Sequence, residues 1–183
     1  LRGGARAARR FVGWQTFFDF GDGEVKPRKT IDTHISTPLF RLPLGAIAGG
    51  APPISLAQRN LLRQLTWQLP SGQRCAKAMG LPDLRPGDLS ELAGYGLGLE
   101  RHTPLWYYVL KEAALATGGQ TLGPVGARIV GEVLIGLMQT DRASWMNGQS
   151  QWRPTLPSRR GRGEFDMVDL LTLAAVDPRS RGQ

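Results

Sequence analysis

The sequence predicts a mainly α-helical fold. Its longer segments place apolar residues at intervals of three and four, the spacing that gathers them on one face of a helix. No segment shows the sustained alternation of apolar and polar residues that a half-buried strand requires. The 183 residues, 41% hydrophobic and 21% charged, are enough for a globular domain with its own core.

The amino-terminal part is expected to hold little regular structure. Residues 14–20 are rich in aromatic side chains and are followed by a Gly-Asp-Gly turn at 21–23. Residues 31–54 contain four prolines and several glycines. Because proline fixes its own φ and has no backbone N–H, this segment is expected to be an extended loop and not a helix.

Helix start and stop signals follow from residue 55 onward. Ser55 and Ser71 are suitable N-caps, Gly80 is a suitable stop, and Thr103 can cap a helix that begins at Pro104. Pro124 opens a further helix in the same way. The expected helices cover residues 56–65, 73–79, 105–117, 125–139 and 165–175.

The first of these helices is amphipathic. One arc holds leucines and is expected to face the core: Leu61, Leu62, Leu65 and Leu69. The opposite arc is polar: Asn60, Arg63, Gln64 and Trp67. A solvent-facing polar arc accounts for the arginine and the glutamine, but asparagine is a poor residue in the middle of a helix unless its amide has a partner. The pattern therefore leaves open a solvent face or a ligand-facing polar arc.

Several site types are disfavoured by composition. The single cysteine, Cys75, excludes an internal disulfide and is expected to be a small helix residue. The two histidines, His34 and His102, lie far apart and form no metal-ligand spacing, so no metal site is expected. No apolar run approaches the roughly 18 residues that a membrane span needs.

The net charge of +8 is concentrated at the two ends of the chain. Residues 1–30 carry seven basic and three acidic side chains, and residues 151–183 carry six and four. The residues between them carry ten and eight, a near balance. A nucleic-acid binder more often carries a stripe of cations with interleaved aromatic side chains. Solvated, mobile basic segments at 1–10 and 158–162 are therefore expected, with no specific nucleic-acid site.

Residues 55–81 carry the pair Asn60 and Arg63, followed by Leu69-Pro70-Ser71. This combination resembles the animal-type haem peroxidase superfamily, in which a helix carries Asn-x-x-Arg and, after a fixed interval, Gly-Leu-Pro and a polar residue. Other segments are similar to bacterial members of that family in the same order: 31–33, 40–43, 91–94, 103–113, 122–126 and 167–171. The likeness spans residues 11–178, which are therefore expected to be the carboxy-terminal part of a peroxidase-like domain. Residues 1–10 are expected to be a disordered basic end, and residues 179–183 a tail.

The resemblance implies that the chain is the carboxy-terminal helical part of a haem peroxidase-like domain. Asn60 would accept a hydrogen bond from the ring N–H of the proximal histidine and orient that iron ligand. Arg63 would lie on the side of a haem propionate, where a planar cation suits a carboxylate. The full-length protein would bind haem and use hydrogen peroxide to oxidise a donor whose identity the sequence does not reveal.

The chain departs from the family at the iron itself. In the family the proximal histidine lies upstream of the Asn-x-x-Arg helix, and the distal histidine and arginine lie further upstream; no residue of this chain matches them. Neither His34 nor His102 is expected to be an axial ligand. At 66–68 the chain has Thr-Trp-Gln where better-known members have Asp-His-Gly, so contacts at that position do not transfer. We therefore expect a fragment without its amino-terminal half, inactive alone and holding no catalytic residue. The alternative is a non-catalytic helical interaction module whose basic ends engage acidic partners.

Overall fold

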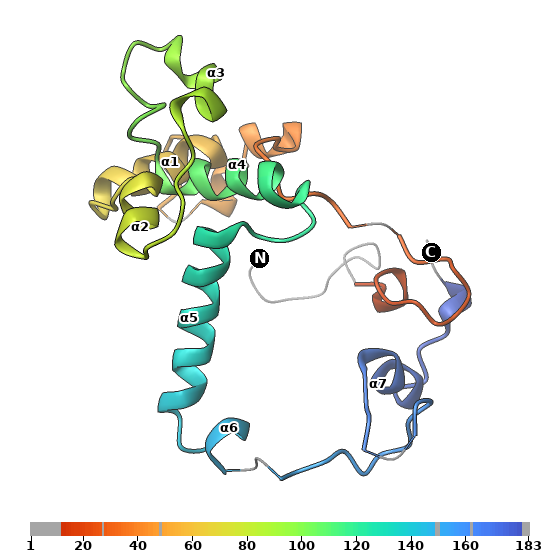
Figure 1. The fold of residues 1–183 in the computed structure, drawn as a ribbon. Helices are drawn as coiled ribbons and strands as arrows, with labels where there is room; N and C mark the ends of the chain where they lie inside the picture. Colours follow the sequence, from red (N-terminus) through yellow and green to blue (C-terminus); the bar gives the residue numbers. More distant parts are fainter. Residues whose placement is uncertain (1–11, 27, 48, 149–150, 162, 181–183) are drawn as a thin grey trace. The chain divides into compact units, whose positions relative to one another are not determined.

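A computed structural model of the chain describes residues 12–26, 28–47, 49–148, 151–161 and 163–180. Over these residues the fold is mainly helical and contains no strand, which confirms the predicted class. The chain divides into two compact units, residues 30–137 and residues 1–29 with 138–183 (Figure 1). Each unit is described by itself below.

The larger unit contains the helices that the sequence predicts. These are α1 (Leu56–Thr66), α2 (Gly72–Ala78), α4 (Leu105–Thr117) and most of α5 (Pro124–Thr140), with a short α3 (Ser90–Ala93) that was not predicted. Ser55 Oγ accepts a hydrogen bond from Gln58 N, and Ser71 Oγ accepts one from Arg74 N, each at 3.3 Å. Both predicted caps are therefore confirmed.

The segment before α1 is a loop, as its prolines predict. It contains two short 3-10 turns, Thr37–Phe40 and Leu44–Ala46, and no α-helix among its described residues. Leu42 N donates to Ile54 O at 2.9 Å, which closes the loop back on itself. The loop therefore returns the chain to the start of α1.

The core of the larger unit lies where α2 meets α4. Its buried members are Cys75, Ala76, Tyr108 and Val125. A Cβ at Gly72 would lie 1.9 Å from Tyr108 Cγ, so only glycine permits this helix contact. The Tyr108 hydroxyl is also satisfied, because it accepts a hydrogen bond from Leu84 N at 2.9 Å. The expectation that Cys75 is a small buried helix residue is confirmed.

The start of α4 corrects a sequence-based expectation. Thr103 is buried, but its hydroxyl donates to Leu99 O at 2.8 Å and does not cap the helix. Leu105 N instead donates to the side-chain oxygen of Gln64, at 3.1 Å, from α1. The predicted cap was wrong because a side chain 41 residues away in sequence satisfies this amide.

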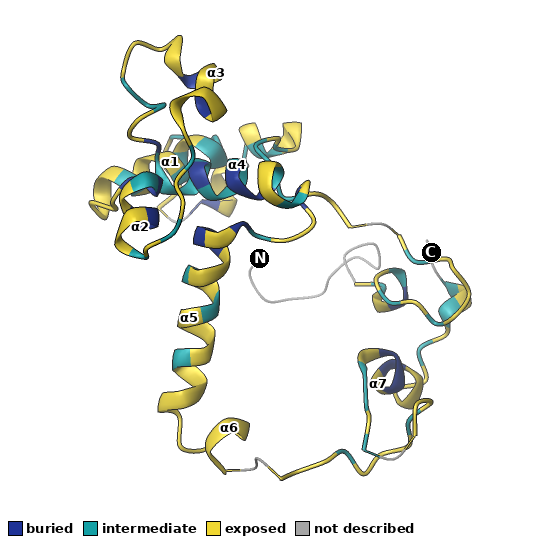
Figure 2. Ribbon diagram, in the orientation of Figure 1, coloured by how far each residue is buried: buried dark blue, intermediate teal, exposed yellow. Residues whose placement is uncertain are grey.

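A buried carboxylate joins α4 to α5. Glu112 is 3% exposed, and Val125 N donates to its two oxygens at 3.0 and 3.2 Å. Gly126 N donates to the same carboxylate at 3.3 Å. These amides belong to the first turn of α5, where the helix dipole also favours negative charge. The rest of α5 is largely exposed (Figure 2).

Among its described residues, the smaller unit contains two short α-helices, α6 (Trp145–Gly148) and α7 (Met167–Leu173), and the 3-10 turns Trp14–Thr16 and Pro178–Ser180. Gln15 Nε2 donates to Ser180 Oγ at 2.7 Å, which ties the two 3-10 turns together. Helix α7 begins two residues later than predicted because Asp166 caps it, and it ends at Leu173. Over the described parts of both units, no helix has the length and apolarity needed to cross a membrane.

Candidate functional site

The leucine arc of α1 does not face a core, although its amphipathic pattern predicts that it should. The leucine arc is exposed, with 39% of Leu61, 42% of Leu62, 73% of Leu65 and 42% of Leu69 accessible. The expectation that this arc faces the core is therefore wrong. The residues of α1 that are partly covered belong to the other side and include Asn60 and Gln64.

Only part of the polar arc faces inward, since Arg63 and Trp67 are exposed. Gln64 accounts for the covered part. Its Nε2 donates to the carbonyl oxygens of Leu69 and Pro70, and its Oε1 accepts from Leu105 N. One amide side chain thus forms hydrogen bonds with two backbone carbonyls that follow α1 and with a backbone N–H in the first turn of α4. The bond to Leu105 N is partly buried, and a backbone N–H is costly to leave unpaired when it is shielded from water, so this bond favours a position of Gln64 against α4.

Asn60 and Arg63 lie one turn apart on α1 and are in contact. Arg63 Nη1 donates to Asn60 Oδ1 at 2.9 Å. Asn60 is partly covered, whereas Arg63 is exposed. An amide oxygen has two lone pairs, so Asn60 Oδ1 can accept a second hydrogen bond. The resemblance singles out both residues, and the structure brings them together.

A hollow of about 220 Å³ lies beside this pair. It is lined by Pro53, Arg59, Leu62, Arg63 and Thr66. Arg59 Nη1 donates to Pro53 O at 3.2 Å, which anchors one of the two guanidinium groups. Two guanidinium groups at one hollow can bind a carboxylate or phosphate group through paired N–H donors.

The fit of this hollow to a haem is partial. Its arginines suit the carboxylate edge of the macrocycle, but its volume is below the ~300–1,000 Å³ of ordinary small-molecule sites. No histidine or cysteine lines it. The described residues also contain no group of three or more His, Cys, Asp or Glu side chains able to hold a metal ion. The lining of this hollow thus offers two arginines for a carboxylate, but it includes neither Asn60 nor an axial ligand.

Both histidines lie on the surface. The side chain of His34 is 92% exposed, and its Nδ1 lies 3.4 Å from Asp32 Oδ1. His102 is exposed, and its backbone N–H donates to Gly98 O. Neither side chain lines the hollow beside Arg59 and Arg63, called the arginine hollow below.

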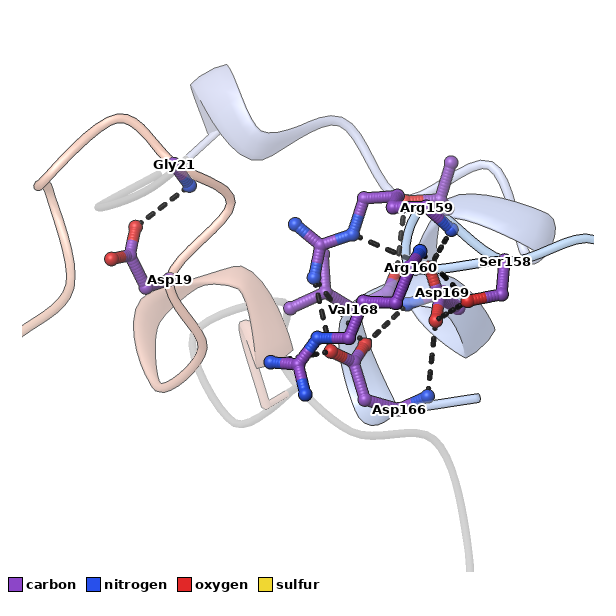
Figure 3. Close-up of polar contacts among 9 residues, drawn as sticks. Asp19, Gly21, Ser158, Arg159, Arg160, Asp166, Val168 and Asp169 are labelled. Atoms are coloured by element: carbon purple, nitrogen blue, oxygen red, sulfur yellow. Dashed lines mark hydrogen bonds and ion pairs between the residues drawn. The ribbon is translucent and has the colours of Figure 1, made fainter. Parts of the chain in front are cut away.

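The basic segment near residue 160 is paired with acids of the smaller unit (Figure 3). Arg159 Nη2 lies 3.1 Å from Asp166 Oδ2, and Arg160 Nη2 lies 3.4 Å from the same oxygen. Asp169 accepts hydrogen bonds from Arg159 N and Ser158 Oγ, both at 3.0 Å. These backbone and side-chain donors lower the pKa of Asp169 to about 2.

Residues 159–161 of the segment at 158–162 are exposed to solvent as expected, but Arg159 and Arg160 are also paired with acids at the start of α7, which that expectation did not include. Arg162 and the basic end at 1–10 lie outside the described residues. A signal for the pairing was present in the sequence, because Asp166 and Asp169 follow the arginines within ten residues.

Comparison with protein-family models, with curated proteins and with solved structures found no match to this chain.

Proposed function

We propose that this chain is the part of a haem-peroxidase-like oxidoreductase that supports the proximal side of the haem. The observation that carries the proposal is the contact of Asn60 with Arg63 beside the hollow that Arg59 also lines. In the family that the sequence resembles, these are the residue types that hold the proximal imidazole and a propionate. The complete protein would oxidise a donor with hydrogen peroxide.

The proposal assigns one role to each polar group. Asn60 Oδ1, already held by Arg63, would accept the N–H of an imidazole through its second lone pair. Arg59 and Arg63 would bind a propionate with permanently charged, planar donors. When bound, haem iron supplies the oxidising chemistry with peroxide, and these residues orient and retain it.

The imidazole and the groups that cleave peroxide would come from a part of the protein that precedes residue 1. Two exposed apolar surfaces support this part of the proposal, since such surfaces are usually covered by protein. The first is the leucine arc of α1. The second is on α5, where the exposed apolar side chains include Val130, Val133, Leu134 and Ile135.

Titration of the haem-free 183-residue chain with hemin tests the proposal by absorbance. We expect weak binding, no spectrum of a histidine-ligated five-coordinate iron, and no effect of His34→Ala. Arg63→Ala should weaken binding further, because a propionate loses a charged partner. Arg74→Ala, an exposed arginine of α2 that does not line the hollow, is the matched control.

Two results would contradict the proposal. A saturable one-to-one site that disappears in His34→Ala would make a surface histidine the ligand. Equal hemin affinity of the Arg63→Ala and Arg74→Ala variants would remove the propionate role of Arg63.

The exposed leucine arc also favours a second candidate, a non-catalytic helical interaction module. The basic ends contribute less to it than the sequence suggests, because Arg159 and Arg160 are paired within the chain. Binding to acidic partners that persists at physiological salt, without any haem affinity, would favour this module.

A further inference from the structure

A second hollow of the larger unit lies between α1, α4 and the segment around α3. Its volume is about 330 Å³, within the ~300–1,000 Å³ of small-molecule sites. None of the side chains that line it is charged: Leu61, Leu92, Tyr95, Leu99, Pro104 and Tyr107. The lining is therefore apolar except for the tyrosine hydroxyl groups.

The hydroxyl of Tyr107 is fixed by charged groups behind it. It donates to Glu91 Oε1 at 2.8 Å, and Lys111 Nζ lies 2.7 Å from the same carboxylate oxygen. Burial and the bond to Glu91 raise the pKa of Tyr107 to about 12, so the hydroxyl stays neutral at physiological pH. The bond from Lys111 lowers the pKa of Glu91, which keeps that carboxylate ionised as an acceptor.

This arrangement leaves the oxygen of Tyr107, a residue that lines the hollow, able to accept a hydrogen bond. Its proton is committed to Glu91, and a hydroxyl oxygen keeps two lone pairs. A lone pair is therefore available to a donor brought by a ligand. An apolar hollow with a few convergent polar groups is the usual form of a small-molecule site.

We propose that this hollow binds a small neutral molecule with one aromatic ring and one hydroxyl group. The ring packs among the leucines and against Tyr95, and the hydroxyl donates to Tyr107 Oη. The site is separate from the arginine hollow and shares no lining residue with it. Binding therefore requires neither haem nor the function proposed above.

Nuclear magnetic resonance titration of the haem-free 183-residue chain tests this proposal, with phenol as the probe and toluene as the probe of equal size without a hydroxyl. We expect phenol to shift the methyl signals of Leu61, Leu92 and Leu99 with a Kd on the order of 1 mM. Toluene should bind at the same place about fivefold more weakly, since it makes no hydrogen bond. In Tyr107→Phe phenol should lose its advantage and bind no more tightly than toluene, because its hydroxyl no longer has an acceptor.

A second pair of variants tests the apolar wall. Tyr95→Ala should weaken both probes about three- to tenfold, the usual loss of one aromatic contact. Leu97→Ala is the matched control, because it is an exposed residue of the same segment that does not line the hollow. Unchanged methyl signals in the probe-free variants show that their fold is kept.

Three results would overturn the proposal: no saturable shift at the lining leucines, equal affinity of the unmodified chain for both probes, or a phenol preference that survives in Tyr107→Phe. None of them bears on the hemin titration, so failure of this proposal is distinguishable from failure of the proposed function.

Discussion

Removal of the buried carboxylate at Glu112 should be one of the most damaging single changes in the larger unit. The carboxylate accepts from Val125 N and Gly126 N, with the shortest distance 3.0 Å. In Glu112→Ala both amides lose their partner while they remain covered by protein. A buried donor without a partner costs about 1–3 kcal/mol, so two of them should lower the free energy of unfolding by about 2–6 kcal/mol.

Two further variants separate the hydrogen bonds from the charge. Glu112→Gln keeps one oxygen acceptor and should cost about 1 kcal/mol, the difference between a charge-assisted and a neutral hydrogen bond. Glu132→Ala removes an exposed carboxylate that pairs with Arg128 four residues earlier, and should cost no more than about 0.5 kcal/mol.

Urea unfolding followed by circular dichroism measures the change, together with hydrogen exchange of the Val125 and Gly126 amides. The exchange measurement is needed because a chain of two units does not have to unfold in one step. If Glu112→Ala is as mild as Glu132→Ala and these amides exchange no faster, the carboxylate does not hold α5.

Three more outcomes are expected. In the full-length protein, Asn60→Ala should reduce haem retention and peroxidase turnover about 10- to 100-fold; unchanged haem content, spectrum and turnover would remove its role toward the proximal imidazole. Leu65→Ala should lower the free energy of unfolding by less than about 0.5 kcal/mol, because the side chain is exposed. Leu89→Ala, at a fully buried site, should lower it by roughly 2–5 kcal/mol in urea unfolding. Equal losses would contradict the outward orientation of the leucine arc. Because the folded-state pKa of Asp169 is lowered to about 2, its stabilisation of α7 should be present above about pH 4 and lost as the pH falls toward 2. In an acid titration followed by circular dichroism, Asp169→Asn should abolish that pH dependence.

Local chemistry explains why the helix positions were predictable. Ser55 and Ser71 cap through amides three residues away, so the signal lies within one turn of the sequence. Gly118, at a φ of 59°, ends α4 where the Gly-Gly pair predicts. The clash that a Cβ at Gly72 would make with Tyr108 depends instead on a contact between two helices, which one sequence does not show.

The orientation of α1 was not predictable for the same physical reason. Amphipathic spacing identifies two faces of a helix. Which of them is covered depends on the segments that pack against the helix and on the hydrogen-bond partners that they provide. In this chain the partner of Gln64 is the first amide of α4, and three hydrogen bonds to one amide side chain decide the outcome. The pattern left open a solvent face or a ligand-facing polar arc. Arg63 and Trp67 are exposed to solvent, whereas Gln64 binds its own protein, an alternative that the pattern did not contain.

That orientation has consequences for both proposed sites. Leu61 and Leu62 are neighbours in sequence, yet they line different hollows. Leu61 lines the hollow of Tyr95 and Tyr107, and Leu62 lines the arginine hollow. The exposed leucine arc of α1 therefore lies between a site suited to a neutral ring and a site suited to a carboxylate. The carboxylate chemistry and the ring chemistry of this surface can thus be tested independently of each other.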